Sequence, residues 1–99
     1  TYMTELLFLV ASAKTATVLE PLASACGRNG TSWCCFITGE GVKQLKNTEL
    51  LKLLPNAERV IACEHSWHEF FGSLECPVEL GSQTTNSEMM IETKRVISL

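Results

Sequence analysis

The residues best suited to chemistry lie in one short stretch that runs from Cys63 to His68. A cysteine reacts as its thiolate, which is favoured at a helix N-terminus and beside positive charge. Cys63 ends an apolar run, and a helix is expected to start soon after it. His65 and His68 can move a proton or carry positive charge near neutral pH, whereas Glu64 opposes the thiolate if it faces the sulfur. We therefore predict a catalytic thiol at Cys63, assisted by His65 and His68.

Other interpretations of the same residues stay open. Cysteine is often fully buried, so Cys63 also fits the last packing residue of a strand. With Cys76 added, Cys63, His65 and His68 form a ligand set suited to zinc, although their spacing is not that of a standard zinc finger. Cys76 also fits a resolving thiol for Cys63, but a small apolar packing residue is the favoured interpretation. The leading prediction therefore includes no metal and no cofactor.

The other three cysteines are predicted to pack in the core. Cys34 and Cys35 are neighbours in an apolar run that predicts a strand, so their side chains should point to opposite faces of a sheet. Cys26 closes the apolar stripe of a predicted helix. The five cysteines form an odd set, and most of them lie inside apolar runs, which argues against a secreted disulfide framework.

Glycines and aromatic side chains near the candidate thiol are expected to shape its surroundings. Gly39 and Gly41 resemble the start of a dinucleotide-binding loop, but Gln44 stands where the third glycine belongs, which excludes a Rossmann fingerprint. We instead expect these glycines to allow a tight backbone path beside the thiol. Trp67 and Phe70 are predicted to line a pocket or a subunit contact.

Composition and charge exclude several classes of function. The 99 residues fit a single domain over residues 1–99 and leave no room for a second core. The eight basic residues are scattered and the net charge is −3, which argues against direct nucleic-acid binding. The sequence contains no Asp, which removes Ser-His-Asp triads and EF-hand loops. The apolar run Leu6–Ala13 is too short for a membrane and lacks signal-peptide features, so we expect a cytoplasmic protein without a membrane partner.

Apolar runs alternate with helical patterns along the chain, as in proteins with parallel sheets. Five strands are expected, at Glu5–Ala11, Ser32–Thr38, Glu58–Cys63, Pro77–Leu80 and Arg95–Leu99. Helices between them are expected to be capped by Asn47 or Thr48, by Ser66, and by a residue of Thr84–Ser87, while Pro21 bends the first helix or delays its start. This order predicts an α/β fold with three α/β/α layers and a mostly parallel five-stranded sheet.

Catalytic and ligand sites of such sheets lie outside the carboxyl ends of the strands. Three predicted loops fall at that edge, at Ser12, at Thr38–Val42 and at Cys63–His68. We therefore expect these loops to converge. Only the third of them carries a cysteine followed by two histidines, which places the predicted chemistry there.

Four segments carry a family resemblance, namely Leu6–Leu9, Phe36–Val42, Val60–Cys63 and Arg95–Leu99. With the order of elements, they resemble the DsrE/DsrF-like (TusD-like) sulfur-relay family over nearly the whole chain. In that family, a cysteine at the end of the matching strand receives sulfane sulfur as a persulfide and passes it to a partner. Cys63 occupies that position, although Glu64–Trp67 is bulkier than the small residues that often follow the family cysteine.

The resemblance implies a sulfurtransferase or sulfur carrier that needs no redox cofactor or metal, because sulfane transfer is thiol exchange. It also implies a homo- or hetero-oligomer, commonly a trimer or hexamer, and a small TusA-like sulfur carrier as partner. Some family members have lost the cysteine, so a non-catalytic interaction subunit is an alternative from a different class. A Cys/His metal-binding protein is the third interpretation.

Overall fold

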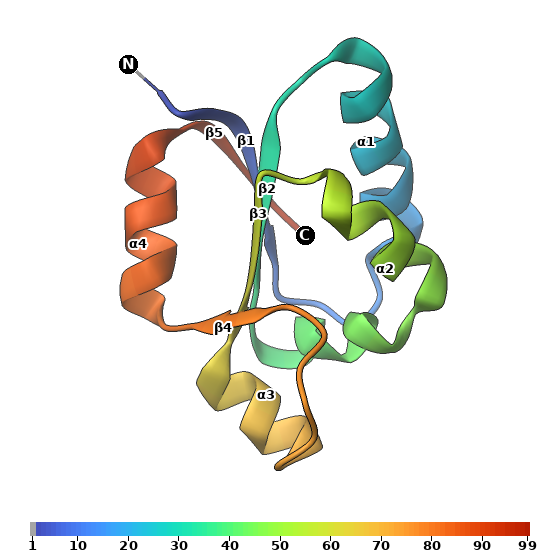
Figure 1. Cartoon of the computed structure of the whole chain (residues 1–99), viewed down its shortest axis with the longest axis vertical. Helices are drawn as coiled ribbons and strands as arrows, with labels where there is room; N and C mark the ends of the chain where they lie inside the picture. Colours follow the sequence, from blue (N-terminus) through green and yellow to red (C-terminus); the bar gives the residue numbers. More distant parts are fainter. Residues whose placement is uncertain (1) are drawn as a thin grey trace.

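The computed structural model describes residues 2–99, so Thr1 of the expected domain lies outside the described residues. At its centre is a five-stranded sheet with the strand order β4-β3-β2-β1-β5 (Figure 1). The strands are β1 (Thr4–Val10), β2 (Trp33–Ile37), β3 (Arg59–Cys63), β4 (Glu79–Gly81) and β5 (Thr93–Ser98). Neighbouring strands are parallel throughout. The predicted α/β fold with a parallel five-stranded sheet is confirmed.

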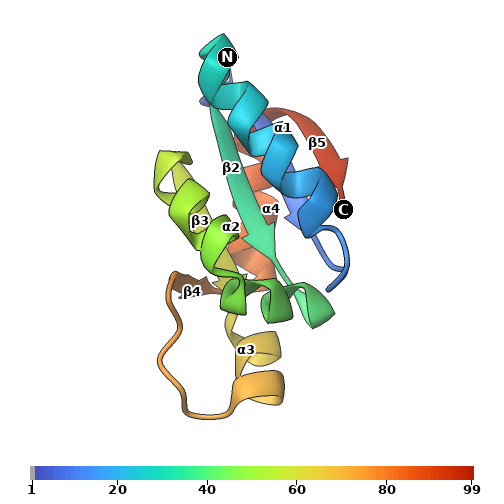
Figure 2. The ribbon, with the colours of Figure 1, turned by 90° about the vertical axis from the view of Figure 1, so that its right-hand side faces the viewer.

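Helices cover both faces of the sheet. They are α1 (Ala16–Asn29), α2 (Thr48–Leu53), α3 (Glu64–Phe71) and α4 (Gln83–Glu92), with the 3₁₀ helices η1 (Gly39–Lys46) and η2 (Leu54–Asn56). Figure 2 shows α1 and α2 in front of the sheet and α4 behind it, while α3 lies beyond the carboxyl ends of the strands. These are the three predicted layers. No helix within residues 2–99 is long and apolar enough to cross a membrane.

Alternate residues of the strands pack into two separate cores, one on each face of the sheet. The core under α1 and α2 includes Phe8, Cys35 and Ile37 from the strands and Leu19 from α1. The smaller core under α4 consists of Leu7, Cys34, Phe36, Ile61, Cys63 and Met89. The prediction that Cys34 and Cys35 point to opposite faces is confirmed. All five residues of β2 are buried, as expected for the central strand of a parallel sheet.

The predicted strand boundaries are within two residues of the observed ones, but two helix starts differ. Helix α3 begins at Glu64, directly after Cys63, so Ser66 is its third residue and not its cap. Helix α4 is capped by Ser82 and not by a residue of Thr84–Ser87. Both helices therefore begin immediately beyond the strand that precedes them, which brings their N-termini close to the sheet edge.

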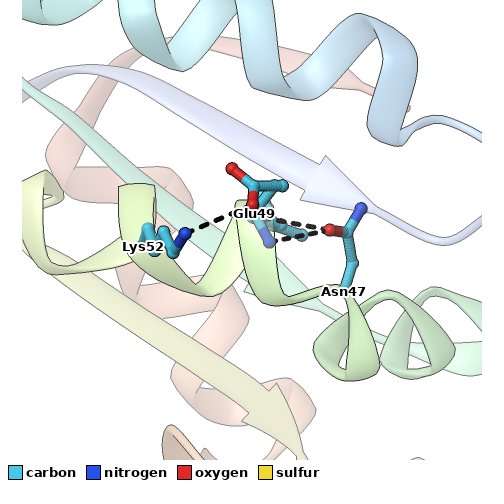
Figure 3. Close-up of polar contacts among 4 residues, drawn as sticks. Asn47, Glu49 and Lys52 are labelled. Atoms are coloured by element: carbon cyan, nitrogen blue, oxygen red, sulfur yellow. Dashed lines mark hydrogen bonds and ion pairs between the residues drawn. The ribbon is translucent and has the colours of Figure 1, made fainter.

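Helix α2 shows the opposite outcome, because its cap signal is local, whereas α1 begins at Ala16 after Thr15 and not after Ser12, the cap that the sequence suggests. The Asn47 side chain caps α2 as predicted, and its Oδ1 accepts from the amides of Glu49 and Leu50 at 3.0 and 3.3 Å (Figure 3). In the same turn Lys52 pairs with Glu49 at 3.2 Å. Helix α1 runs through Pro21 without a delayed start.

Candidate active site

The carboxyl ends of β3 and β4 form the point where the chain changes sides of the sheet. Strand β3 leads into α3, whose Trp67 joins the core under α1 and α2. Strand β4 leads into α4, whose Met89 packs on the other face. The connections after β3 and β4 leave toward opposite faces of the sheet, which opens a crevice between the ends of the two strands. Ligand and catalytic sites of parallel sheets are expected in such a crevice.

A cavity of about 380 Å³ lies at this position. It is lined by Cys63, Glu64, His65, His68, Gly81, Ser82 and Gln83. Cys63 is the N-cap residue of α3 and Ser82 that of α4, so the positive ends of two helix dipoles face one cavity. The Cys63 side chain is only 6% exposed. The cavity therefore holds a nearly covered thiol in surroundings that favour negative charge.

The pKa of the Cys63 thiol is shifted downward. Burial raises this pKa, but the hydroxyl and amide of Ser66, the hydroxyl of Thr38 and the amide of His65 lower it below its ordinary value of 9.0. The Cys63 sulfur accepts no side-chain N-cap hydrogen bond. The amides of Ser66 and His65 therefore lower the pKa without the geometry of a full helix cap. The other four cysteines all have raised pKa values, with burial as the main cause. Hydrogen-bond donors thus single out Cys63.

Two hydroxyl groups connect the loops around the sulfur. The Ser66 Oγ accepts a hydrogen bond from the Gly39 amide at 2.8 Å and lies 3.5 Å from Thr38 Oγ1. The Gln83 Nε2 donates to Thr38 Oγ1 at 3.4 Å. These residues come from the end of β2, from the first turn of α3 and from the start of α4. The site is therefore assembled only when three distant segments meet.

Glycines make this assembly possible. Gly39 has φ of +55°, a left-handed conformation that turns the chain so that its amide reaches Ser66. A Cβ at Gly41 would collide with the carbonyl of Val10, so η1 packs directly on the end of β1. The predicted tight backbone path beside the Cys63 loop is found at Gly39, whereas the close approach at Gly41 is to the end of β1.

The two histidines lie at the cavity, but neither is bonded to the thiol. His68 Nδ1 donates to the Gly72 carbonyl at 2.9 Å, and its Nε2 lies 3.6 Å from Glu64 Oε1. His65 contributes its backbone amide to the lowering of the Cys63 pKa. Within residues 2–99 no hydrogen bond joins either imidazole to the sulfur, so the roles of the two side chains stay predictions.

The predicted role of Trp67 at a pocket or subunit contact is wrong. Its side chain is 4% exposed, packs against Phe71 with ring centroids 4.4 Å apart, and donates from Nε1 to the Leu74 carbonyl at 2.7 Å. Phe70 is half-buried with Lys43 Nζ 4.7 Å from its ring centroid. Both aromatic residues lie on the side of α3 that packs toward η1, away from the cavity.

Cys76 does not join Cys63. It packs against the core under α1 and α2, whereas Cys63 belongs to the core under α4. Burial raises the pKa of Cys76, which makes it a poor candidate for a resolving thiol. In the part of the chain that the structure describes, no three His, Cys or carboxylate side chains are arranged to hold a metal ion.

Sequence reasoning missed the polar residues that act on the thiol. Thr38 was recognised only as part of a loop, and Ser66 only as a helix cap. Gln83 had no local signal, because its contact with Thr38 depends on how α4 crosses the end of the sheet. The Ser12 loop, expected to converge on the thiol, instead meets η1 through a hydrogen bond from Gln44 Nε2 to its carbonyl.

Fold and site together define a class of protein, an α/β domain with a nearly covered thiol of lowered pKa where the chain changes sides of a parallel sheet. No family model matches the chain, and the comparison with curated proteins finds no match.

Proposed function

We propose that the protein is a sulfur-relay protein that carries sulfane sulfur as a persulfide on Cys63. One observation carries the proposal: among five cysteines, only Cys63 has a lowered pKa, and it faces a cavity at the carboxyl edge of the sheet. A lowered pKa increases the fraction of thiolate near neutral pH, and the thiolate is the nucleophile in sulfane transfer. The DsrE/DsrF-like resemblance points to the same cysteine.

The transfer is a pair of thiol exchange steps. In loading, the Cys63 thiolate attacks the outer sulfur of a donor persulfide R–S–SH, the donor S–S bond breaks, and R–S⁻ leaves. The product is Cys63–S–SH. In unloading, an acceptor thiolate attacks the outer sulfur, the Cys63 S–S bond breaks, and the Cys63 thiolate returns. The transferred sulfur keeps its oxidation state in both steps, so neither step needs an oxidant, a reductant, a redox cofactor or a metal.

Helix N-termini and side chains at the cavity contribute to both transfer steps. The N-termini of α3 and α4 stabilise the anion on Cys63 or on its persulfide. His65 and His68 lie at the cavity wall, and we assign them the balancing of the negative charge on the attacking and leaving thiolates. Because the thiol is 6% exposed, the donor sulfur must enter the cavity rather than touch a flat surface.

The proposal includes partners and a compartment. The acceptor is a small TusA-like sulfur carrier or a protein of the same chemistry, and the protein forms a homo- or hetero-oligomer, either a trimer or a hexamer. All five cysteines are free thiols, which suits the reducing cytoplasm. Neither a membrane nor a nucleic acid is a direct partner in this scheme.

The test is to incubate the protein with a small persulfide donor and measure its intact mass. We expect a single-sulfur adduct that disappears after reduction and is absent from Cys63→Ser. Cys76→Ser is the matched control, because it removes a partly exposed thiol whose pKa is raised, and it should still load. Absence of the adduct, or its persistence in Cys63→Ser, would rule the function out.

A non-catalytic interaction subunit is the second candidate, and exposed apolar side chains favour it. Met3 is 72% exposed, Ile91 is 78% exposed and Leu74 is 62% exposed. This alternative predicts that Cys63 reacts with iodoacetamide at neutral pH no faster than thiols of the denatured chain. Faster alkylation of the folded protein at Cys63, measured by peptide mass spectrometry, decides for the relay function.

A further inference from the structure

Two helices begin side by side at the cavity around Cys63. Strand β3 ends at Cys63 and β4 ends at Gly81, and these two residues are register partners in neighbouring parallel strands. Helix α3 starts at Glu64, directly after β3, and α4 starts at Gln83, after Ser82. Figure 1 shows that the two helices leave this end of the sheet in different directions. Their N-termini therefore lie about 5 Å apart, which is one strand spacing.

Little negative charge within the chain neutralises these two N-termini. The first amides of a helix have no acceptor within the helix. The Cys63 side chain caps none of those of α3, and the Ser82 hydroxyl accepts from the Thr85 amide of α4. The first turn of α3 contains Glu64, which lies 3.6 Å from His68 Nε2, whereas the first turn of α4 contains no acidic residue. Charge complementarity therefore favours an anion in the cavity.

The depth of the thiol restricts the size of the sulfur donor. Cys63 is 6% exposed and lines a cavity of about 380 Å³, near the lower end of the range for small-molecule sites. Loading requires the outer sulfur of the donor to reach the Cys63 sulfur itself. Unloading requires less, because the sulfur under attack then lies one S–S bond, about 2 Å, farther from the Cys63 sulfur. A small donor and a larger acceptor therefore suit the two steps.

Resting on the persulfide function proposed above, we propose that the sulfur donor is a small oxyanion that carries sulfane sulfur, of which thiosulfate is the simplest. The Cys63 thiolate attacks the outer sulfur of ⁻S–SO₃⁻, the S–S bond breaks, and sulfite leaves with the electron pair of that bond. The products are the Cys63 persulfide anion and SO₃²⁻, so atoms and charge balance without an oxidant or a reductant. The two helix N-termini bind the oxygens of thiosulfate and stabilise the charge that builds up on the departing sulfite.

The first test measures single-turnover loading by thiosulfate at constant ionic strength, followed by intact mass and by released sulfite. We expect a saturable rate and one sulfite for each sulfur bound, with neither product from Cys63→Ser. Sulfate has the same oxyanion group but no sulfane sulfur. It should therefore compete with thiosulfate and slow the alkylation of Cys63 by iodoacetamide, whereas chloride at the same ionic strength should do neither.

Two charge variants of the cavity wall sharpen the test. Gln83→Glu adds a carboxylate in the first turn of α4, where it favours the helix but repels an anionic donor. The half-saturating concentration of thiosulfate should rise about fivefold, the effect of one unit charge on a dianion across a water-filled cavity. For methanethiosulfonate, a sulfane donor with a single negative charge, the rise should be about twofold. Glu64→Gln removes a carboxylate of the wall and should shift both concentrations in the opposite direction.

Ser87→Glu is the matched control. It adds the same charge at an exposed position one turn farther along α4, where distance and salt weaken its effect on the cavity. Neither half-saturating concentration should change by as much as in Gln83→Glu. A general folding defect would affect thiosulfate and methanethiosulfonate equally, so unequal shifts identify electrostatic repulsion of the donor.

The outcomes separate the identity of the donor from the persulfide function. Loading by a small persulfide but not by thiosulfate overturns the donor assignment and leaves the persulfide function intact. Loading by thiosulfate that neither sulfate nor Gln83→Glu weakens also overturns the anion site. Failure of every donor to load Cys63 overturns the persulfide function and the donor assignment with it. Saturable loading with release of sulfite, competition by sulfate and the expected shifts in both charge variants support both.

Discussion

Two regions of the sheet contain cysteines with little exposed surface, and the pKa values of their thiols shift in opposite directions. Cys35 lies in the middle of β2 at 0% exposure, and burial raises its pKa far above the ordinary value. Cys63 lies at the end of β3 at 6% exposure, yet its pKa is lowered. The strand interior offers the sulfur only apolar neighbours, whereas the strand end offers hydroxyls and the unpaired amides of a helix N-terminus. The opposite pKa shifts follow from the deeper burial of the Cys35 sulfur together with the donors around Cys63.

The largest expected difference between the two regions is in sulfur loading. Cys63→Ser should abolish the single-sulfur adduct completely. Cys35→Ser should load at the wild-type rate per folded molecule, because Cys35 lies on the opposite face of the sheet from the Cys63 side chain. Intact-mass measurement after exposure to a persulfide donor checks both variants. Adduct in Cys63→Ser, or none in folded Cys35→Ser, would show that the comparison assigns the reactive thiol wrongly.

A large effect on stability is expected where β4 supports the site. Gly81 pairs in register with Cys63, and a Cβ at Gly81 would lie 2.6 Å from Ile61 Cγ2. Gly81→Ala should therefore cost roughly 1–3 kcal/mol of unfolding free energy through overpacking. Gly81→Ala should also raise the pH midpoint of iodoacetamide alkylation at Cys63, because a shift of β4 moves the start of α4 away from the cavity around the thiol. Urea denaturation measures the first effect.

The control for this variant is Gly27→Ala in α1, where a Cβ would have no atom within 4 Å. It should stabilise the protein by about 0.5–1 kcal/mol, because alanine is favoured over glycine inside a helix. Equal destabilisation of Gly81→Ala and Gly27→Ala would show that close packing at β4 is not the cause of the loss of stability in Gly81→Ala.

A smaller effect is expected at the cap of α2, which lies away from the thiol. Asn47→Ala removes the acceptor of the Glu49 and Leu50 amides and should cost about 1 kcal/mol. Asn47→Ser keeps an acceptor at the cap and should restore most of that loss. In neither variant should the alkylation midpoint of Cys63 move. A shift of this midpoint would mean that general loosening of the fold, rather than the local donors, sets the reactivity of the thiol.

The same contrast between interior and edge explains what the sequence could predict. Apolar runs such as the one ending at Cys63 predicted the strands and the edge position of the thiol, because burial on both faces leaves a local pattern. Trp67 was misassigned although Phe70 and Phe71 follow it at helical spacing, which is itself the signal for one packed face. The contact of Thr38 with Gln83 joins residues 45 positions apart, so no local pattern could reveal it.

The smallest expected effect is on the alkaline dependence of stability, and its sign differs between the two regions. Because the folded-state pKa of Cys63 lies below 9.0, the folded protein loses this proton first, and stability rises with pH until the unfolded thiol has also ionised near 9.0. For Cys35 the folded-state pKa is raised, so only the unfolded chain ionises as the pH passes 9.0, and stability falls. The destabilisation caused by Cys63→Ser should therefore grow as the pH approaches 9, whereas that caused by Cys35→Ser should shrink above it. Urea denaturation between about pH 7 and pH 10 measures both trends, and slopes of the same sign would contradict opposite proton affinities in the two regions.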